Sequence, residues 1–150
     1  MRVLLQRVTG AAVTVVEDDA ERESGRIGPG AVALVGFGEG DDEGALGWMA
    51  AKIADLRIFP SDGSGFELSL RETGKELLAI SQFTLYGDAR KGRRPDFGAA
   101  APYAEAGSLY AAFVERCEAE LPGQVAVGEF GALMRVSLVN DGPVTLWLER

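Results

Sequence analysis

Apolar and polar positions along the first forty residues follow the pattern of strands. Two β-rich runs, 3–8 and 11–16, are separated by a threonine and a glycine, which predicts a hairpin-like pair of strands. An acidic stretch follows, and we expect residues 17–25 to form a loop. The run 31–37 is continuously apolar between two glycines, so it suits a buried strand near the middle of the fold.

Two later segments have helical spacing. Between residues 42 and 56, apolar residues recur at helical intervals behind an acidic first turn, although two internal glycines weaken the pattern. The second helix has the clearest pattern in the chain, with an apolar stripe from Leu109 to Leu121 that ends at Pro122. The single cysteine, Cys117, lies on this stripe and is expected to be a small buried hydrophobe rather than a nucleophile.

Further strands are expected around these helices. Residues 66–70 alternate strictly, which predicts a strand with one exposed face, and residues 76–86 have the pattern of one long strand. The remaining apolar runs complete the strands: 125–127, 133–139 and 144–148. Many strands with two main helices predict a single α+β domain over residues 1–150, in which curled antiparallel sheets form an open β-barrel or two packed layers.

Composition narrows the class of protein. With 47% hydrophobic and 25% charged residues, a chain of 150 residues is expected to fold around one core. No apolar stretch approaches the roughly 20 residues that cross a bilayer, and the N-terminus enters a strand pattern without a cleavable signal, so we expect a cytoplasmic protein with no membrane partner. The net charge of −8 argues against broad, non-specific nucleic-acid binding, and no DNA partner is expected.

The positive charge is nevertheless concentrated in one place. Four cations lie within five residues: Arg90, Lys91, Arg93 and Arg94. A polyanion could be held at this loop while the rest of the surface repels it, and a solvated surface loop is the alternative interpretation.

A first polar segment follows the apolar run that begins at residue 76. Ser81 and Thr84 offer hydroxyls, Gln82 offers an amide, and the end of a strand can leave backbone N–H groups unpaired. Fixed donors of this kind are what an acyl-transfer site needs for the oxygen of a tetrahedral intermediate. The alternative is that Ser81 and Thr84 only face solvent while Phe83 faces the core.

The second polar segment, 140–145, contains the sequence Asn-Asp-Gly-Pro. A plain hairpin turn is one interpretation, and a cis bond between Gly142 and Pro143, which would direct two carbonyls the same way, is the other. The chain has no histidine, so a Ser-His-Asp triad and a Cys-His pair are excluded, and no Cys/His cluster could bind zinc. We expect no metal and no cofactor.

With these motifs the chain resembles the D-aminoacyl-tRNA deacylases, historically called D-tyrosyl-tRNA deacylases. The matching stretches occur in family order over nearly the whole chain: 1–3, 6–9, 52–53, 56–59, 81–86, 90–95 and 136–145. One departure is visible, because the acidic stretch 17–24 is longer than the compact hairpin expected of the family.

The resemblance implies a homodimer with its active site at the subunit interface. There, Gly142 and Pro143 of one subunit would enter the pocket built by residues 81–84 of the other and leave no room for an L side chain. The substrate would be D-aminoacyl-tRNA, together with glycyl-tRNA, and the ribose 2′-OH would help to position or activate water. This would be a chiral proofreading step in translation.

The resemblance also implies roles for individual residues. Backbone N–H groups near Phe83 and Thr84 would polarise the ester, and Gln82 would hold substrate or water. Thr84 is either a nucleophile or a positioning group, and the second role is favoured because no base is expected beside it. Two further roles follow from the resemblance on weaker matches. Arg7 would fix the Gly142–Pro143 loop, and Met134 would pack on the terminal adenosine.

The sequence therefore predicts an ester hydrolase that acts on D-aminoacyl-tRNA and contacts tRNA phosphates through the loop at residues 90–94. The alternative is a non-catalytic tRNA-binding protein that uses the same basic loop. An esterase acting on small free esters is a third hypothesis, against which the missing histidine counts.

Overall fold

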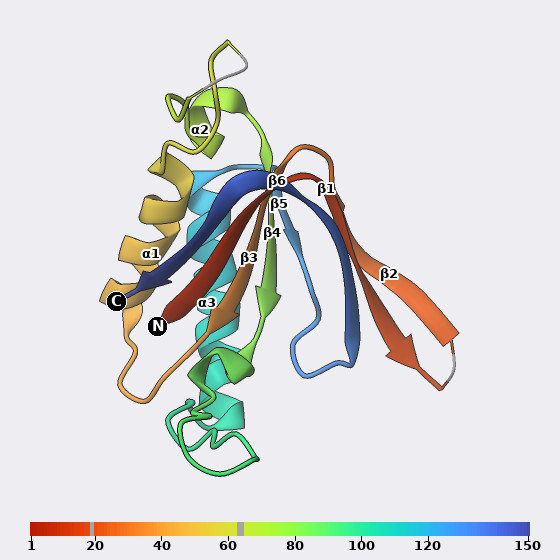
Figure 1. Ribbon diagram of the computed structural model, residues 1–150, viewed down its shortest axis with the longest axis vertical. Helices are drawn as coiled ribbons and strands as arrows, with labels where there is room; N and C mark the ends of the chain where they lie inside the picture. The colour runs from red at the N-terminus through yellow and green to blue at the C-terminus, as the bar shows by residue number, and fades with distance from the viewer. Residues whose placement is uncertain (19, 63–64) are drawn as a thin grey trace.

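The computed structural model describes residues 1–18, 20–62 and 65–150. It shows a mixed sheet that curls into a nearly closed barrel, with two long helices packed on one side (Figure 1). The strands are β1 (Arg2–Glu17), β2 (Ala20–Ile27), β3 (Gly30–Gly36), β4 (Glu76–Ser81), β5 (Val125–Val127) and β6 (Met134–Glu149). The helices are α1 (Glu43–Asp55), α2 (Leu70–Thr73) and α3 (Tyr103–Glu120), with a 3₁₀ turn η1 (Phe83–Tyr86). The predicted α+β class is confirmed.

The sheet has the strand order β2-β1-β3-β4-β5, and β6 pairs with β1 outside this path. β1 is antiparallel to β2, β3 and β6, whereas β3, β4 and β5 run parallel to one another. The parallel pairs arise because the connection from β3 to β4 contains α1 and the connection from β4 to β5 contains α3. The sheet is therefore mixed rather than wholly antiparallel.

Two apolar cores fix this arrangement. One lies between the sheet and the helices and includes Leu5, Met49, Ile53 and Phe113. A smaller core lies within the curl of the sheet. The barrel nearly closes where β2 approaches β5, because a Cβ on Gly25 would stand only 2.7 Å from the Val127 carbonyl oxygen.

Both predicted helices are confirmed. Asp42 caps α1 by accepting a hydrogen bond of 2.9 Å from the N–H of Ala45. In α3, the apolar stripe faces the core through Tyr110, Phe113 and Cys117. Burial raises the pKa of the Cys117 thiol to about 12, so the group is neutral at physiological pH, as expected for a structural cysteine. Within the described residues, no helix is long and apolar enough to cross a membrane.

Two predictions for the N-terminal region are wrong. The runs 3–8 and 11–16 form the single strand β1, which continues through Gly10 because β6 pairs with both of its halves. The acidic stretch predicted as a loop is the end of β1 and most of β2, although Asp19 lies outside the described residues. β2 is an edge strand with mostly exposed side chains, so its sequence lacks the alternation that marks a strand with one buried face.

Three predictions for later strands also need correction. The segment 66–70 makes only an isolated bridge at Leu68, and Ser69 then caps α2 through a capping box with Glu72. Gly63 and Ser64, which precede this segment in the sequence, lie outside the described residues. The expected strand 76–86 ends at Ser81, where the chain turns into η1. The runs 133–139 and 144–148 belong to one strand, β6, because both halves find partners on β1.

Candidate active site

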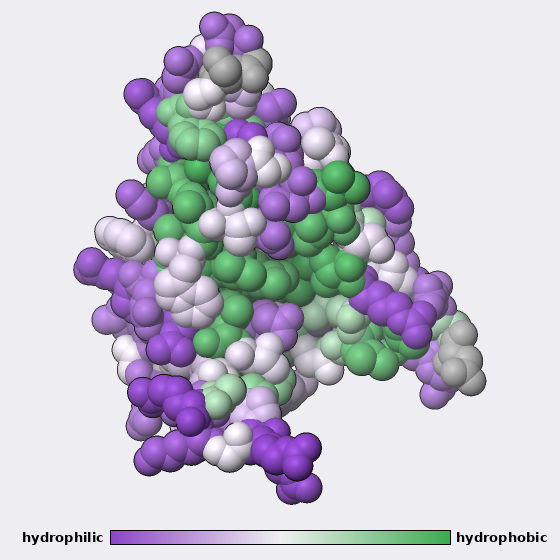
Figure 2. Space-filling view, viewed as in Figure 1, coloured by the Kyte–Doolittle hydropathy of each residue, from purple (hydrophilic) through white to green (hydrophobic). Residues whose placement is uncertain are grey.

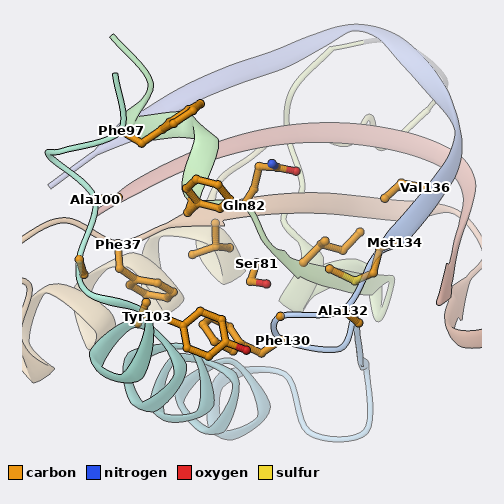
Figure 3. Close-up of a pocket in the computed structure, with 16 residues that line it drawn as sticks. Phe37, Ser81, Gln82, Phe97, Ala100, Tyr103, Phe130, Ala132, Met134 and Val136 are labelled. Atoms are coloured by element: carbon orange, nitrogen blue, oxygen red, sulfur yellow. The ribbon is translucent and has the colours of Figure 1, made fainter. Parts of the chain in front are cut away.

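A cavity of about 540 Å³ opens beside the end of β4 (Figure 3). Its walls come from the ends of β3 and β4, the segment before α3 with the start of that helix, and the β5–β6 connection with the start of β6. Most of the lining is aromatic or aliphatic: Val35, Phe37, Ile80, Phe83, Phe97, Ala100, Ala101, Tyr103, Ala106, Phe130, Ala132, Met134 and Val136. Ser81 and Gln82 add polar side chains to the lining.

The predicted first motif lies at this cavity because β4 ends there. The N–H of Gln82 donates to the Val35 carbonyl at 2.6 Å, and the chain then leaves the sheet to form η1. Within the described part of the chain, the N–H groups of Phe83 and Thr84 donate no hydrogen bond. The first donors of a helical turn have no partner within that turn, so these two are available to a bound oxygen.

Thr84 stands beside the lining residues rather than among them. Its hydroxyl accepts a hydrogen bond from the Gln82 side-chain amide, which fixes the two side chains together. Among the described residues that line the cavity, Tyr103 is the only one with an ionisable side chain. The cavity therefore offers polar groups that can orient a substrate, but no carboxylate, amine or imidazole that could act as a base at neutral pH.

The structure adds an aromatic wall that sequence reasoning missed. Tyr103 and Phe130 lie with ring centroids 5.1 Å apart, and Phe83 meets Phe97 at 5.2 Å. These side chains come from separate loops and one helix start, so no local pattern groups them. The local sign in the sequence is a large aromatic residue directly before a glycine in a loop, at Phe97 and at Phe130.

Sequence reasoning also missed Tyr110, whose side chain ties together the elements around the cavity. Its buried hydroxyl stands 2.9 Å from the Ala79 carbonyl oxygen and 3.2 Å from that of Gly128, so it ties α3 to β4 and to the β5–β6 connection. Burial raises the pKa of Tyr110, which keeps the phenol neutral and able to donate. In the sequence, this residue is indistinguishable from the other members of the apolar stripe.

The second motif has the predicted cis bond between Gly142 and Pro143. Arg7, whose side chain is almost buried, donates from Nε to the Asp141 carbonyl at 3.2 Å and from Nη2 to the Gly142 carbonyl at 3.1 Å. Its Nη1 donates to the carbonyl of Ile58. The predicted contact of Arg7 with this loop is therefore present.

Within one chain, the two motifs are not brought together. Pro143 lines a separate, smaller cleft of about 230 Å³ with Ile58, Phe66 and Leu146, and none of these residues lines the larger cavity. Met134, by contrast, does line the larger cavity, and a Cβ on Gly128 would meet its sulfur at 2.8 Å.

The exposed side of β6 is unusually apolar. Large hydrophobic side chains stand in solvent at Val136, Val139, Leu146 and Trp147, the last with 48% of its surface exposed. Figure 2 shows hydrophobic residues gathered in a band across the face on which β6 runs. Exposed hydrophobic side chains gathered in this way are typical of a surface that contacts another molecule.

The basic cluster forms an exposed loop next to the cavity. Reciprocal backbone hydrogen bonds between Asp88 and Asp96 close the loop, and Phe97 follows directly. Arg90 pairs with Asp88 at 2.7 Å, and this hydrogen-bonded contact lowers the pKa of Asp88 to about 2. The three other cations of the cluster, Lys91, Arg93 and Arg94, have no carboxylate within 4.0 Å among the described residues.

Among the described residues, the N–H groups of Phe83 and Thr84 have no partner, and the cavity beside them is lined by no carboxylate, amine or imidazole. A site of this class can hold the oxygen of an acyl group but offers it no side-chain base at neutral pH. Comparison with known proteins gives the particular family. The family model described as D-Tyr-tRNA(Tyr) deacylase matches residues 4–149, and the chain belongs to this family. The resemblance seen in the motifs is thereby confirmed, as is the expected ester hydrolase at the level of the family.

Curated relatives match along the full length. The D-aminoacyl-tRNA deacylase of Pelobacter propionicus is 51% identical over 150 residues and covers 100% of both chains. That of Syntrophobacter fumaroxidans is 48% identical over 149 residues, 99% of this chain and 97% of the relative. The solved structure of a c-Myc DNA Unwinding Element Binding Protein has a TM-score of 0.91 and 38% identity, and the match covers 100% of this chain and 99% of that one. A probable eukaryotic D-amino acid tRNA deacylase, 19% identical with a TM-score of 0.84, shares the fold.

Proposed function

We propose that this protein hydrolyses the ester bond of D-aminoacyl-tRNA, and of glycyl-tRNA, and rejects L-aminoacyl-tRNA. One observation carries the proposal: among the described residues, the N–H groups of Phe83 and Thr84 donate no hydrogen bond, and they follow the end of β4 beside a cavity lined by no side chain able to act as a base at neutral pH. Residues 1–150 act as one deacylase domain. Its place of action is the cytoplasm, where aminoacyl-tRNA is used.

In this mechanism, the ester carbonyl oxygen accepts hydrogen bonds from the N–H groups of Phe83 and Thr84. Negative charge then develops on an oxygen that fixed donors already face, which lowers the barrier without reorganisation of the site. Gln82 holds the substrate or the attacking water, and its hydrogen bond to Thr84 fixes its direction. The terminal adenosine packs on Met134 at the cavity wall. The ribose 2′-OH of the substrate supplies the polar group that the cavity lacks.

The site is completed by a second copy of the chain. Gly142 and Pro143 of the partner subunit enter the cavity and leave no space for an L side chain, which selects handedness by exclusion. Two observations support this arrangement. Pro143 stands on a different cleft from the cavity within its own chain, and the exposed apolar side of β6 offers a surface for a homodimer.

The tRNA body contacts the basic loop. Lys91, Arg93 and Arg94 are exposed and without a carboxylate neighbour among the described residues, so they can meet phosphate without first breaking an ion pair. Arg90 contributes less, because Asp88 already neutralises it. The rest of the surface carries the excess negative charge of the chain, which confines nucleic acid to this place.

The test compares matched substrates. Release of tyrosine from D-Tyr-tRNA and from L-Tyr-tRNA is measured with the purified protein under the same conditions. We expect rapid release of the D-amino acid and no release above background of the L-amino acid. Equal rates, or no release from D-Tyr-tRNA, would reject the proposal, and binding without hydrolysis would favour a non-catalytic tRNA-binding protein.

A Thr84→Ala variant separates the two roles considered for this residue. As a positioning group, Thr84 loses one hydrogen bond with Gln82, so we expect kcat to fall by less than about tenfold. As a nucleophile, its removal would cost about 10⁴-fold or more. Single-turnover hydrolysis of D-Tyr-tRNA measures the difference, and trapping of an acyl-enzyme on Thr84 would contradict the positioning role.

A further inference from the structure

We propose that Arg2 is a positioning residue for ester hydrolysis, because it holds η1 from the side opposite the cavity and so sets where the N–H groups of Phe83 and Thr84 stand. This inference rests on the proposed function. Arg2 is not among the residues that line the cavity, so it acts only through the turn.

The guanidinium of Arg2 contacts the far end of η1 in two ways. Its Nη1 donates to the Leu85 carbonyl at 3.1 Å, and its central carbon lies 4.3 Å from the centroid of the Tyr86 ring. Its Nε donates at 2.8 Å to Glu149 at the end of β6, which fixes the direction of the planar group. One side chain thus connects β1, β6 and the turn.

No other side chain replaces this contact. Among the residues that the structure describes, Arg2 is the only side chain that donates a hydrogen bond to a backbone carbonyl of η1. The other backbone bonds of the turn are local, from Leu85 to the Gln82 carbonyl at 3.2 Å and from Gly87 to the Thr84 carbonyl at 2.9 Å. Local bonds shape the turn but do not tie its end to the sheet.

The turn is also in close contact with β3, at Gly36, the residue that pairs with Arg2 across the sheet. A Cβ on Gly36 would lie 2.9 Å from the Gln82 carbonyl oxygen and 3.2 Å from side-chain atoms of Leu85 and Tyr86. The turn therefore cannot move toward β3. Loss of Arg2 would release it in the other direction, and the donors at Phe83 and Thr84 would move with it.

Arg2 contributes little to folding stability by comparison. Its side chain is 30% exposed and that of Glu149 is 53% exposed, and exposed ion pairs of this kind stabilise proteins only slightly. A change in catalysis without a matching change in stability is thus the expected result of removing it.

The experiment uses the full-length protein and D-Tyr-tRNA, with kcat and KM measured separately. In Arg2→Met, the apolar stem remains and the donors are lost, so we expect kcat to fall about tenfold or more, because small displacements of a catalytic group are costly, while KM stays within about twofold. Arg2→Lys keeps a donor that can reach the Leu85 carbonyl and is expected to recover part of the loss. The melting temperature should change little in both variants.

Two matched controls isolate the contact with the turn. Arg116→Met removes an exposed ion pair with Glu43 that lies at 2.8 Å between α1 and α3, far from η1 in the chain. Glu149→Gln removes the charge that faces Arg2 but keeps a side-chain oxygen that accepts from Nε, so the direction of the guanidinium and its bond to Leu85 are retained. Both variants are expected to keep kcat within about twofold of the wild type, as for other exposed ion pairs.

A wild-type kcat in Arg2→Met would overturn the inference, as would a loss in Arg2→Met that Glu149→Gln reproduces in full. If Arg2→Met does not fold, the kcat of Arg2→Lys is compared with that of the wild type instead, and a wild-type value would overturn the inference. In either variant, a change confined to KM would also overturn it. Failure of the wild-type protein to hydrolyse D-Tyr-tRNA is a different result, since it rejects the proposed function itself.

Discussion

A Gly142→Ala variant is expected to fold normally and to lose about 100-fold or more of its kcat/KM for D-Tyr-tRNA, because a misplaced substrate reacts far more slowly. Within one chain, a Cβ added at Gly142 meets nothing within 4 Å, so the methyl group has no steric cost for folding. In the proposed homodimer, the same methyl group projects into the cavity of the partner subunit, where it displaces the ester from the donors at Phe83 and Thr84.

Gly47→Ala is the matched control for this variant. A Cβ at Gly47 also meets nothing within 4 Å, but this residue lies in α1, where alanine is expected to stabilise the helix by up to about 1 kcal/mol. Thermal unfolding and D-Tyr-tRNA hydrolysis are measured for both variants. Full activity in a folded Gly142→Ala protein would contradict the cross-subunit arrangement, although hydrolysis at the cavity could still occur.

A substrate that ends in 2′-deoxyadenosine and carries the D-aminoacyl ester on its 3′ oxygen is expected to react about 100-fold or more slowly than the natural substrate. General acid–base groups commonly contribute rate factors of this size, and the cavity lining offers none that works at neutral pH. The chain contains no histidine, and in the proposed mechanism the ribose hydroxyl helps to position or activate the water instead.

The comparison must separate the affinity for the deoxy substrate from the rate of ester hydrolysis. Single-turnover rates at saturating protein give the chemical step, and competition against the natural substrate shows whether the deoxy substrate still binds. Unchanged single-turnover rates for the deoxy substrate would remove the RNA-assisted mechanism and direct attention to Thr84 and Gln82. A loss of binding alone would contradict the assigned role equally, because the hydroxyl would then serve recognition only.

The sequence predicted the helices better than the strands. Both long helices have a periodic apolar face, and α1 begins at a capping aspartate that the sequence displays. β2 escaped prediction because it is a polar edge strand, and α2 escaped because its capping box, Ser69 with Glu72, follows a misleading alternation. Pairing decided the rest: β1 and β6 are each one long strand because they hydrogen-bond to each other along their lengths.

The candidate site was predicted only in part. Ser81, Gln82 and Phe83 line one cavity together with Met134, and Arg7 contacts the loop at Gly142. The motifs and the family resemblance singled out these residues, and their roles in hydrolysis stay predictions. The aromatic wall, the support from Tyr110 and the contact of Arg2 with η1 were not predicted. Each joins residues that are distant in the sequence, and no local pattern records such neighbours.

By itself, the sequence determined the class of fold, the two helices, the family and the two motifs, because each depends on local periodicity or on a short run of residues. Only the tertiary structure decided that the sheet is mixed, that β4 ends where η1 begins, and that Pro143 stands apart from the cavity of its own chain. These features depend on which segments, distant in the sequence, pair and pack in the folded protein. The free energy of those contacts depends on both segments together, so no local pattern of residues records it.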